Sequence, residues 1–121
     1  MSKLVLIADD EDDILGLVSL QLRRAGYEVV EARDGVEALT LALERSPALA
    51  VLDVTMPELD GLEVTRRLRA NEATRELPVI LLSARVQEAD VARGREAGAN
   101  DYLLKPFRAR ELQARVDALL A

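Results

Sequence analysis

Short apolar segments alternate with longer amphipathic segments along the whole chain, and this alternation repeats five times. The apolar segments are rich in Val, Ile and Leu, which favours β-strands, and they lie at residues 3–8, 27–32, 48–53, 78–83 and 101–105. The segments between them carry apolar residues at spacings of three and four, which is typical of amphipathic helices. Because parallel strands need crossover connections, the alternation predicts a doubly wound α/β fold, with a parallel sheet covered by helices on both faces.

Four helices are predicted from clear apolar spacing and a fifth from a weaker pattern. The clear apolar positions are Ile14, Leu15, Val18 and Leu22; Val36, Leu39 and Leu43; Leu62, Val64, Thr65 and Leu68; and Leu112, Val116, Leu119 and Leu120. The weaker helix is expected from about Val86 to Ala97. Its end and that of the first helix are predicted from Ala97-Gly98 and Ala25-Gly26, because glycine commonly follows a helix C-terminus.

Local signals add three further expectations. Asp60 is a candidate N-cap for the third helix, and Asp34-Gly35 is typical of a turn. The segment YEVVEA (27–32) contains more polar residues than the other strands. Strands buried on both faces read as nearly continuous apolar runs. We therefore expect the YEVVEA strand at the edge of the sheet.

The composition limits the range of functions. A chain of 121 residues suits one domain, so we expect residues 1–121 to form a single unit. The formal net charge of -6 argues against direct nucleic-acid binding, which needs a basic surface. The chain has no cysteine and no apolar stretch long enough to cross a bilayer, so no membrane association is expected and a cytoplasmic location is favoured.

Chemically distinctive residues lie at the carboxyl ends of four of the predicted strands. They are Asp9-Asp10, Asp53, Ser83 and Lys105-Pro106. In an open parallel sheet these ends share one edge, and ligands bind there. Three carboxylates brought together would repel one another, and Mg²⁺ would relieve the repulsion because it prefers oxygen ligands. A carboxylate beside Mg²⁺, a lysine and a hydroxyl could accept a phosphoryl group, so the pattern predicts an aspartyl phosphate.

Each of these residues also has an ordinary structural explanation. The acidic run at 9–13 could stabilise a helix N-terminus, and Asp53 could simply end a strand. Ser83 could cap the next helix, Lys105 could be a solvated loop residue, and Tyr102 could lie at a sheet edge with its hydroxyl in water. Their joint placement at strand ends favours the functional interpretation.

Four motifs together resemble the response-regulator receiver domain of two-component signalling, also called CheY-like. They are Asp9-Asp10, LDVTMPELDG (52–61), LLSA (81–84) and GANDYLLKPF (98–107). The resemblance covers the whole chain and implies a five-stranded parallel sheet of flavodoxin-like topology, in the order 2-1-3-4-5. It also implies that Asp53 is a phosphoacceptor in a signalling domain that is not an enzyme. The donor would be a phosphohistidine on a sensor histidine kinase or a histidine phosphotransfer protein.

The resemblance implies a role for each residue of the site. Asp10 and Asp53 would hold Mg²⁺ through their side chains and Thr55 through its backbone carbonyl, with Asp9 supporting the ion through water. Lys105 would pair with the phosphoryl group, and Ser83 would donate a hydrogen bond to it. Tyr102 would rotate into space that Ser83 vacates. Pro57 and Gly61 would shape the loop after Asp53, and the Lys105–Pro106 peptide would be cis.

The same resemblance implies an output face on the fourth helix, the fifth strand and the fifth helix. Asp101, Glu111 and Arg115 lie on or beside that face and match charges that support dimers in one branch of the family. A weak homodimer, an effector domain or a separate partner protein would use this surface. Exposed ion pairs contribute only about 0–1 kcal/mol each, so such a dimer is expected to be weak.

Two alternative functions remain. A haloacid-dehalogenase-like phosphatase also uses a strand-end Asp, Mg²⁺, a hydroxyl and a Lys, but it usually has a second Asp where this chain has Thr55. A phosphorylation-independent pseudo-receiver would usually lack the phosphoacceptor, an acidic partner or the lysine, and all are present here.

Overall fold

The computed structural model describes residues 2–84 and 88–121, in which five strands alternate with five helices. The elements are β1 (Leu4–Ala8), α1 (Asp12–Arg24), β2 (Glu28–Ala32), α2 (Gly35–Arg45), β3 (Leu49–Asp53), α3 (Gly61–Ala70), β4 (Val79–Ser83), α4 (Glu88–Ala97), β5 (Asp101–Leu104) and α5 (Ala109–Leu120). Every strand boundary lies within one residue of its prediction. The helix predicted from about Val86 ends at Ala97 as expected, but its predicted start lies outside the described residues.

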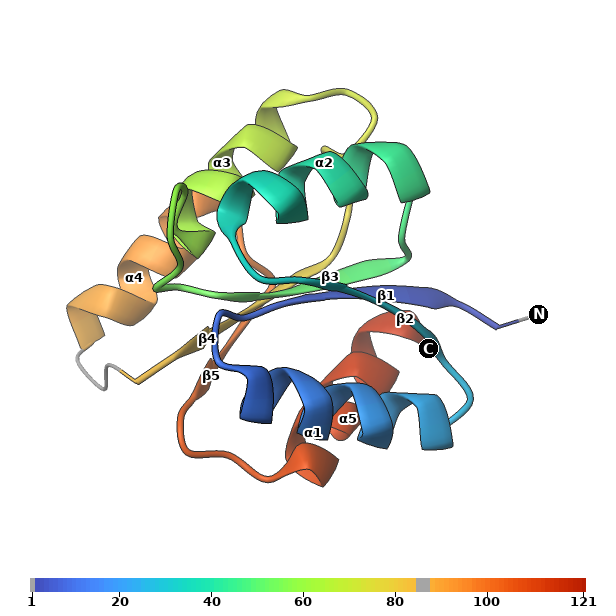
Figure 1. The fold of residues 1–121 in the computed structure, drawn as a ribbon. Helices are drawn as coiled ribbons and strands as arrows, with labels where there is room; N and C mark the ends of the chain where they lie inside the picture. Colours follow the sequence, from blue (N-terminus) through green and yellow to red (C-terminus); the bar gives the residue numbers. More distant parts are fainter. Residues whose placement is uncertain (1, 85–87) are drawn as a thin grey trace.

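The five strands form one parallel sheet in the order β2-β1-β3-β4-β5, which confirms both the doubly wound fold and the predicted order. Figure 1 shows three layers, with α2, α3 and α4 above the sheet and α1 and α5 below it. The strand β2 is at an edge, as its polar sequence predicted. The crossovers run in opposite directions from β1, so a topological switch point lies between β1 and β3.

Two apolar clusters hold the layers together, one on each face of the sheet. Leu6, Leu52 and Leu81 belong to the cluster beneath α2 and α3, and Ile7 and Val51 belong to the one against α1 and α5. All residues of β3 and β4 are buried. Burial of one such aliphatic side chain stabilises the fold by about 1.5–3 kcal/mol, so these two strands are a rigid support for what lies at their ends.

The helix α2 is present where predicted, but its buried face differs from the apolar pattern. Val36 is 49% exposed and Leu43 is 42% exposed, whereas Ala38 and Ala42 are buried. Gly35 also lies inward, because a Cβ at this position would be 1.9 Å from the backbone oxygen of Leu59. The face of α2 that packs on the rest of the domain therefore carries small residues, and the larger apolar side chains lie on its exposed face.

The start of α3 confirms the capping prediction, and the start of α2 corrects one. The Asp60 carboxylate accepts a hydrogen bond from the backbone N–H of Glu63 at 2.8 Å. Asp34, expected in a turn, instead caps α2 and accepts from the N–H of Glu37 at 2.7 Å. The same residue type serves both purposes because a short carboxylate can reach the free N–H groups of a first helical turn.

The helices α1 and α4 end in the same hydrogen-bonded arrangement. Gly26 and Gly98 have φ values of 99° and 105°, in the left-handed region that glycine adopts readily. In α1, Tyr27 donates to the Leu22 carbonyl and Gly26 to Arg23; in α4, Ala99 donates to the Gly94 carbonyl and Gly98 to Arg95. The two Ala-Gly pairs thus end helices, as predicted.

Two further observations complete the description. The Lys105–Pro106 peptide, implied to be cis by the resemblance, is cis. Among the described residues, no helix has the length and apolar character needed to cross a bilayer.

Candidate functional site

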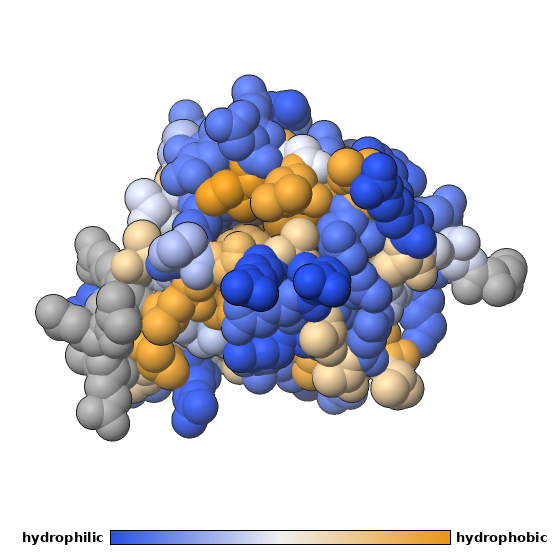
Figure 2. Space-filling model, turned by 90° about the horizontal axis from the view of Figure 1, so that it is seen from below, coloured by the Kyte–Doolittle hydropathy of each residue, from blue (hydrophilic) through white to orange (hydrophobic). Residues whose placement is uncertain are grey.

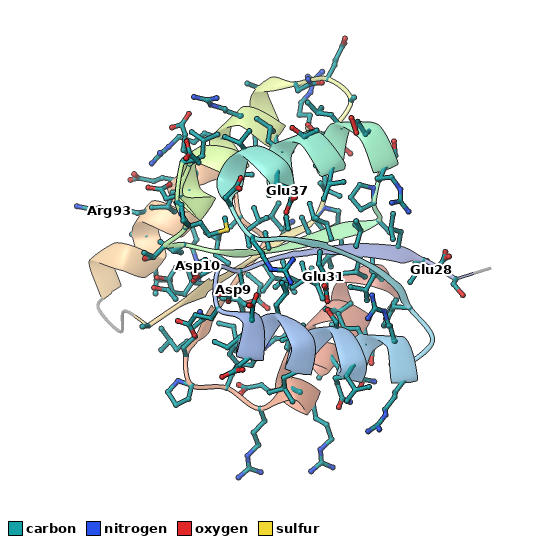
Figure 3. All side chains as sticks on the ribbon, in the orientation of Figure 1. Asp9, Asp10, Glu28, Glu31, Glu37 and Arg93 are labelled. Carbon is teal, nitrogen blue, oxygen red and sulfur yellow. The ribbon has the colours of Figure 1, made fainter. Side chains whose placement is uncertain are left out.

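The residues predicted from strand ends meet at one edge of the sheet. Asp9 and Asp10 follow β1, Asp53 is the last residue of β3, and Lys105 follows β5. Figure 3 shows Asp9 and Asp10 side by side at the left end of the sheet, opposite the end where Glu28 lies. The site therefore lies at the carboxyl ends of the strands, beside the switch point.

Lys105 connects the two buried carboxylates. Its ammonium nitrogen is 3.0 Å from Oδ2 of Asp9, 3.4 Å from Oδ1 of Asp53 and 3.9 Å from Oε1 of Glu11. The side chain of Asp9 is 0% exposed and that of Lys105 is 11% exposed. Oδ1 of Asp9 accepts a hydrogen bond from the backbone N–H of Glu11 at 2.9 Å. One cation thus faces three acids.

This excess of negative charge changes the protonation of the site. Burial, together with the charges of Asp9 and Asp10, raises the pKa of Asp53 from 3.8 to about 6, although Lys105 opposes the rise. Burial acts to lower the pKa of Lys105, but the hydrogen bond to Asp9 and the nearby carboxylates outweigh it and the net pKa is raised. The lysine is therefore charged at neutral pH, and Asp53 is mostly ionised.

The carboxylates suit a hard divalent cation. Asp9, Asp10 and Asp53 each place one oxygen within 4.8 Å of the others. Among the described residues, Oδ2 of the buried Asp9 has no polar partner other than the ammonium group of Lys105. An all-oxygen group with surplus negative charge and an open side fits Mg²⁺, which binds few protein ligands and keeps several waters.

Replacing Asp10 with asparagine should separate repulsion from metal binding. Asp10 is exposed, and its charge raises the pKa of Asp53. Without metal, we expect the variant to be more stable than wild type by less than about 1 kcal/mol, since one repulsive charge is lost. With Mg²⁺ at one hundred times its dissociation constant, wild type should gain about 2.7 kcal/mol, and the variant should gain little. Urea denaturation with Mg²⁺ or with EDTA measures both effects.

Asp13→Asn is the matched control, because Asp13 is also exposed and acidic but lies in the first turn of α1. It should keep the full response to Mg²⁺. An Asp10→Asn variant that is destabilised without metal and still responds fully would contradict the assignment of Asp10 as a ligand.

The acidic group opens into a cavity of about 150 Å³, lined by Asp10, Glu11, Asp53, Thr55, Ala84 and Lys105. The loop after β3 turns sharply beside it. A Cβ at Gly61 would lie 2.3 Å from the backbone oxygen of Asp53, and the Gly61 N–H donates to the Val54 carbonyl at 2.9 Å. The Pro57 carbonyl accepts from the N–H groups of Gly35 and Leu59. These contacts hold the loop against the strand that carries Asp53.

Ser83 and Tyr102 are not among the residues that line the cavity. Ser83 is 3% exposed at the end of β4, and its backbone carbonyl accepts from the N–H of Lys105 at 2.7 Å. Tyr102 is half-buried and packs on the same apolar cluster as Leu81, the residue opposite it on β4.

Asp101, Glu111 and Arg115 lie apart from the site. Arg115 pairs with Asp101 at 2.7 Å and lies 3.9 Å from Glu111.

Two residues of this region were not predicted from the sequence. Glu11 contributes both an N–H to Asp9 and a third carboxylate near Lys105. Its position inside the acidic run at 9–13 was the available signal. Ala84 lines the cavity; it is the last residue of the LLSA motif (81–84), but no role was predicted for it.

Taken together, the fold and the site define a class of protein: a doubly wound α/β domain with an acidic group that could hold a metal ion, and one lysine, at its switch point. The profile described as "Response regulator receiver domain" matches residues 5–117, and the chain belongs to that family. This agrees with the resemblance in its sequence motifs.

Curated relatives support the same family. The chain is 46% identical over 120 residues to the alkaline phosphatase synthesis transcriptional regulatory protein PhoP of Bacillus subtilis, covering 99% of this chain and 49% of that protein. It is 46% identical over 116 residues to the DNA-binding dual master transcriptional regulator RpaA of Synechocystis, covering 96% of this chain and 48% of that protein. The chain thus spans about half the length of these relatives.

Solved structures agree in fold. A putative response regulator from Chloroflexus aurantiacus is 40% identical with a TM-score of 0.94, covering 99% of this chain and 98% of that one. The chemotaxis response regulator CheY4 of Vibrio cholerae is 31% identical with a TM-score of 0.93, covering 98% and 99%. The receiver domain of a sensor histidine kinase from Pseudomonas aeruginosa, described with magnesium in its active-site cleft, is 32% identical with a TM-score of 0.91, covering 99% and 98%.

Proposed function

We propose that residues 1–121 form one receiver domain in which Asp53 accepts a phosphoryl group from a phosphohistidine of a partner protein. The observation that carries this proposal is the contact of a buried acid pair, Asp9 and Asp53, with the single ammonium group of Lys105. Residues 1–121 contain no histidine, so the donor lies outside this domain. A sensor histidine kinase or a histidine phosphotransfer protein is such a donor.

The residues of the site suit this transfer. A pKa of about 6 leaves the Asp53 carboxylate ionised at neutral pH, so one of its oxygens can attack phosphorus. A P–O bond to Asp53 forms as the P–N bond to the donor breaks, and the imidazole leaves with the bonding electrons and takes up a proton. Lys105, 3.4 Å from Asp53, is placed to hold an oxygen of the transferred group.

Mg²⁺, held by the side chains of Asp10 and Asp53 and the backbone carbonyl of Thr55, would neutralise charge on the phosphoryl oxygens. Asp9 would support the ion through water. We assign Ser83 the role of a hydrogen-bond donor to the phosphoryl group. Pro57 and Gly61 would keep the loop after Asp53 in place.

A groove next to the site favours a protein donor. It has a volume of about 380 Å³ and is lined by Glu11, Ile14, Leu17, Ala84, Lys105, Pro106 and Phe107. Three of these residues also line the cavity at Asp53. Leu17 is 52% exposed and Leu20 is 48% exposed. Figure 2 shows the face formed by α1 and α5, where hydrophobic groups lie exposed among hydrophilic ones. An apolar surface continuous with the acceptor suits a protein partner.

Phosphorylation by a small donor tests the proposal directly. Incubation with acetyl phosphate and Mg²⁺ should add one phosphoryl group, because the site supplies the nucleophile and its electrostatic support. Intact mass spectrometry would measure the modified fraction, and reduction of the acyl phosphate followed by peptide mapping would locate it at Asp53. EDTA should suppress the reaction.

Asp53→Asn should remain unmodified, while Asp13→Asn should be modified like wild type. Equal modification of Asp53→Asn would contradict the assignment. Turnover of a chromogenic phosphate ester in amounts well above one per chain would instead favour the phosphatase alternative.

We further propose that the output surface is formed by α4, β5 and α5, and that it contacts an effector domain, a partner protein or a second copy. Lys105 directly follows β5, and Tyr102 lies within that strand, so a charge change at Asp53 reaches this surface through few contacts. The domain itself does not bind nucleic acid, because its formal net charge is -6.

Reversing the charge of Arg115 should weaken any homodimer without affecting phosphorylation. Arg115 bridges Asp101 on β5 and Glu111 on α5 within one chain, and the same three charges are available to a second copy. In Arg115→Glu we expect at least a several-fold weaker self-association of the phosphorylated domain, measured by sedimentation. Arg23→Glu, on α1, is the control and should associate like wild type. If both variants behave alike, the surface lies elsewhere.

A further inference from the structure

Gly94 lies inside α4, three residues before its last residue, where glycine is less favourable than alanine. It is buried. The chain has a second helix-interior glycine, Gly16 in α1, which is exposed and would find no atom within 4 Å if it carried a Cβ. The surroundings of Gly94 are very different, and they involve the aromatic ring of Tyr102.

The ring of Tyr102 fills the space that a side chain at position 94 would need. A Cβ built at Gly94 lies 2.9 Å from Cδ2 and 3.2 Å from Cε2 of Tyr102, and 3.1 Å from Cδ1 of Leu81. The shortest of these separations is closer than two carbon atoms pack in a protein interior. A methyl group at position 94 therefore cannot coexist with the present position of the ring.

Comparison with α1 shows what is unusual about this helix end. Both helices end in the same arrangement, in which a backbone N–H donates to the carbonyl five residues earlier. That carbonyl belongs to Leu22 in α1 and to Gly94 in α4. Leu22 is 0% exposed and packs in the core. An apolar contact commonly accompanies this helix end. In α4 the helix supplies no side chain for that contact, and the ring of Tyr102 from β5 takes its place.

The segment that directly follows α4 is held in place, which limits how far the end of the helix can move away from the ring. Arg69 on α3 donates from Nε to the Gly98 carbonyl at 2.9 Å and from Nη2 to Oδ1 of Asn100 at 3.0 Å. Oδ1 of Asn100 also accepts from the N–H of Val79 at 2.9 Å. These bonds tie the segment after α4 to α3 and β4. The ring, which turns about single bonds, is the part that can yield.

The ring of Tyr102 has room to move, and it lies on the same face of the sheet as the side chain of Ser83. A cavity of about 90 Å³ lies beside it, with Val91, Gly94 and Asn100 among its lining residues. Tyr102 pairs with Leu81 on β4, and Ser83 is two residues further along the same strand. Because side chains alternate along a strand, Ser83 projects from the same face as Leu81.

We propose that Gly94 is a positioning residue for Tyr102. Because residue 94 has no side chain, α4 leaves a space, here called the seat, in which the ring of Tyr102 lies before phosphorylation. The seat sets how readily the ring leaves this position, and thereby how strongly phosphorylation of Asp53 changes the surface of α4 and β5. The second part rests on the proposed function, whereas the first part concerns the unphosphorylated domain alone.

Tyrosine fluorescence can test the seat directly, because the chain has two tyrosines and no tryptophan. In a Tyr27→Phe background, all tyrosine emission comes from Tyr102. Adding Gly94→Ala should raise the quenching constant of Tyr102 with acrylamide, since the ring is displaced toward solvent. Adding Gly16→Ala should leave this constant unchanged. Equal quenching in the Gly94→Ala and Gly16→Ala proteins would overturn the proposal.

A double-mutant cycle tests the same contact through stability. Gly16→Ala should raise the denaturation midpoint, because alanine is the better helix former. Gly94→Ala should fail to raise it, or should lower it, while Tyr102 is present. In a Tyr102→Ala background, Gly94→Ala should raise the midpoint as Gly16→Ala does. If the Gly94→Ala single variant does not fold, the comparison in the Tyr102→Ala background still tests the contact. Equal effects of Gly94→Ala in both backgrounds would overturn the proposal.

The phosphorylated protein supplies a readout that a purely structural role would not change. Phosphorylation should alter Tyr102 quenching in the Tyr27→Phe protein, and this alteration should be smaller after Gly94→Ala, although the phosphorylated fraction by intact mass is the same. An undiminished alteration would overturn the link to the switch. A protein that is not phosphorylated at all contradicts the proposed function, and the quenching and the cycle then decide the role of Gly94 on their own.

Discussion

Replacing Lys105 with methionine should destabilise the metal-free domain by about 3 kcal/mol, within the range for removing one partner from a buried ion pair. The ammonium group is the only cation within 4.0 Å of the buried carboxylates of Asp9 and Asp53 among the described residues. Methionine keeps much of the aliphatic stem and removes the charge. The two acids then face each other without compensation, and their burial limits how well water can replace the lysine.

Urea denaturation in EDTA at neutral pH would measure this loss. Lys3→Met is a well-matched control, because these are the only two lysines in the chain and the Lys3 ammonium donates to the Leu120 carbonyl at an exposed site. We expect a cost of less than about 1 kcal/mol for Lys3→Met. Mg²⁺ should restore part of the stability of Lys105→Met. If the two variants are equally stable in EDTA, the acidic group does not depend on Lys105.

Replacing Asp53 with asparagine should stabilise the metal-free domain by about 2 kcal/mol at pH 7. The pKa of Asp53 rises from 3.8 to about 6 on folding, so the folded state binds the proton more tightly than the unfolded state. Ionisation of Asp53 therefore destabilises the fold as the pH rises. The shift corresponds to about 3 kcal/mol, which solvent at the mouth of the cavity reduces to about 2 kcal/mol.

The pH dependence gives this prediction its sign. Below about pH 4, Asp53 is protonated in both states and the variant should have no advantage. The advantage should grow between about pH 4 and 6 and remain constant above. Lys105 keeps Asp9 as a partner in the variant, at 3.0 Å. Asp60→Asn, at an N-cap that accepts either residue, is the control for replacing an acid by its amide away from the site, and it should change the stability little at pH 7. An advantage that is equal at all pH values would contradict the raised pKa.

Much of the fold was predictable because its signals are local. Apolar runs and helical spacing located all five strands to within one residue, and the polar residues of β2 placed it at an edge. The buried face of α2 was not predictable in the same way. Its selection of Ala38 and Ala42 over Val36 and Leu43 depends on how closely the helix approaches its neighbours, which spacing along one helix does not encode.

The site also has a part that local sequence signals predict and a part that depends on contacts between elements. Strand ends identified Asp9, Asp10, Asp53 and Lys105, because parallel strands bring such ends together. Ser83 was expected near the phosphoryl group and is buried at its strand end, yet its part in the reaction stays a prediction. The role of Gly94 could not be predicted, because it follows from a contact between α4 and a ring on another element.

The complete burial of β3 and β4 bears on how such domains diversify. Asp53 and Ser83 are the last residues of these strands, so their positions are inherited from the core and not from the loops around them. The chain and its Chloroflexus aurantiacus neighbour differ at more than half of their positions and still superimpose with a TM-score of 0.94. Mutations on exposed helix faces can therefore alter which protein is recognised without moving the residues at the ends of the buried strands. Specificity and reactivity are in this sense separately heritable.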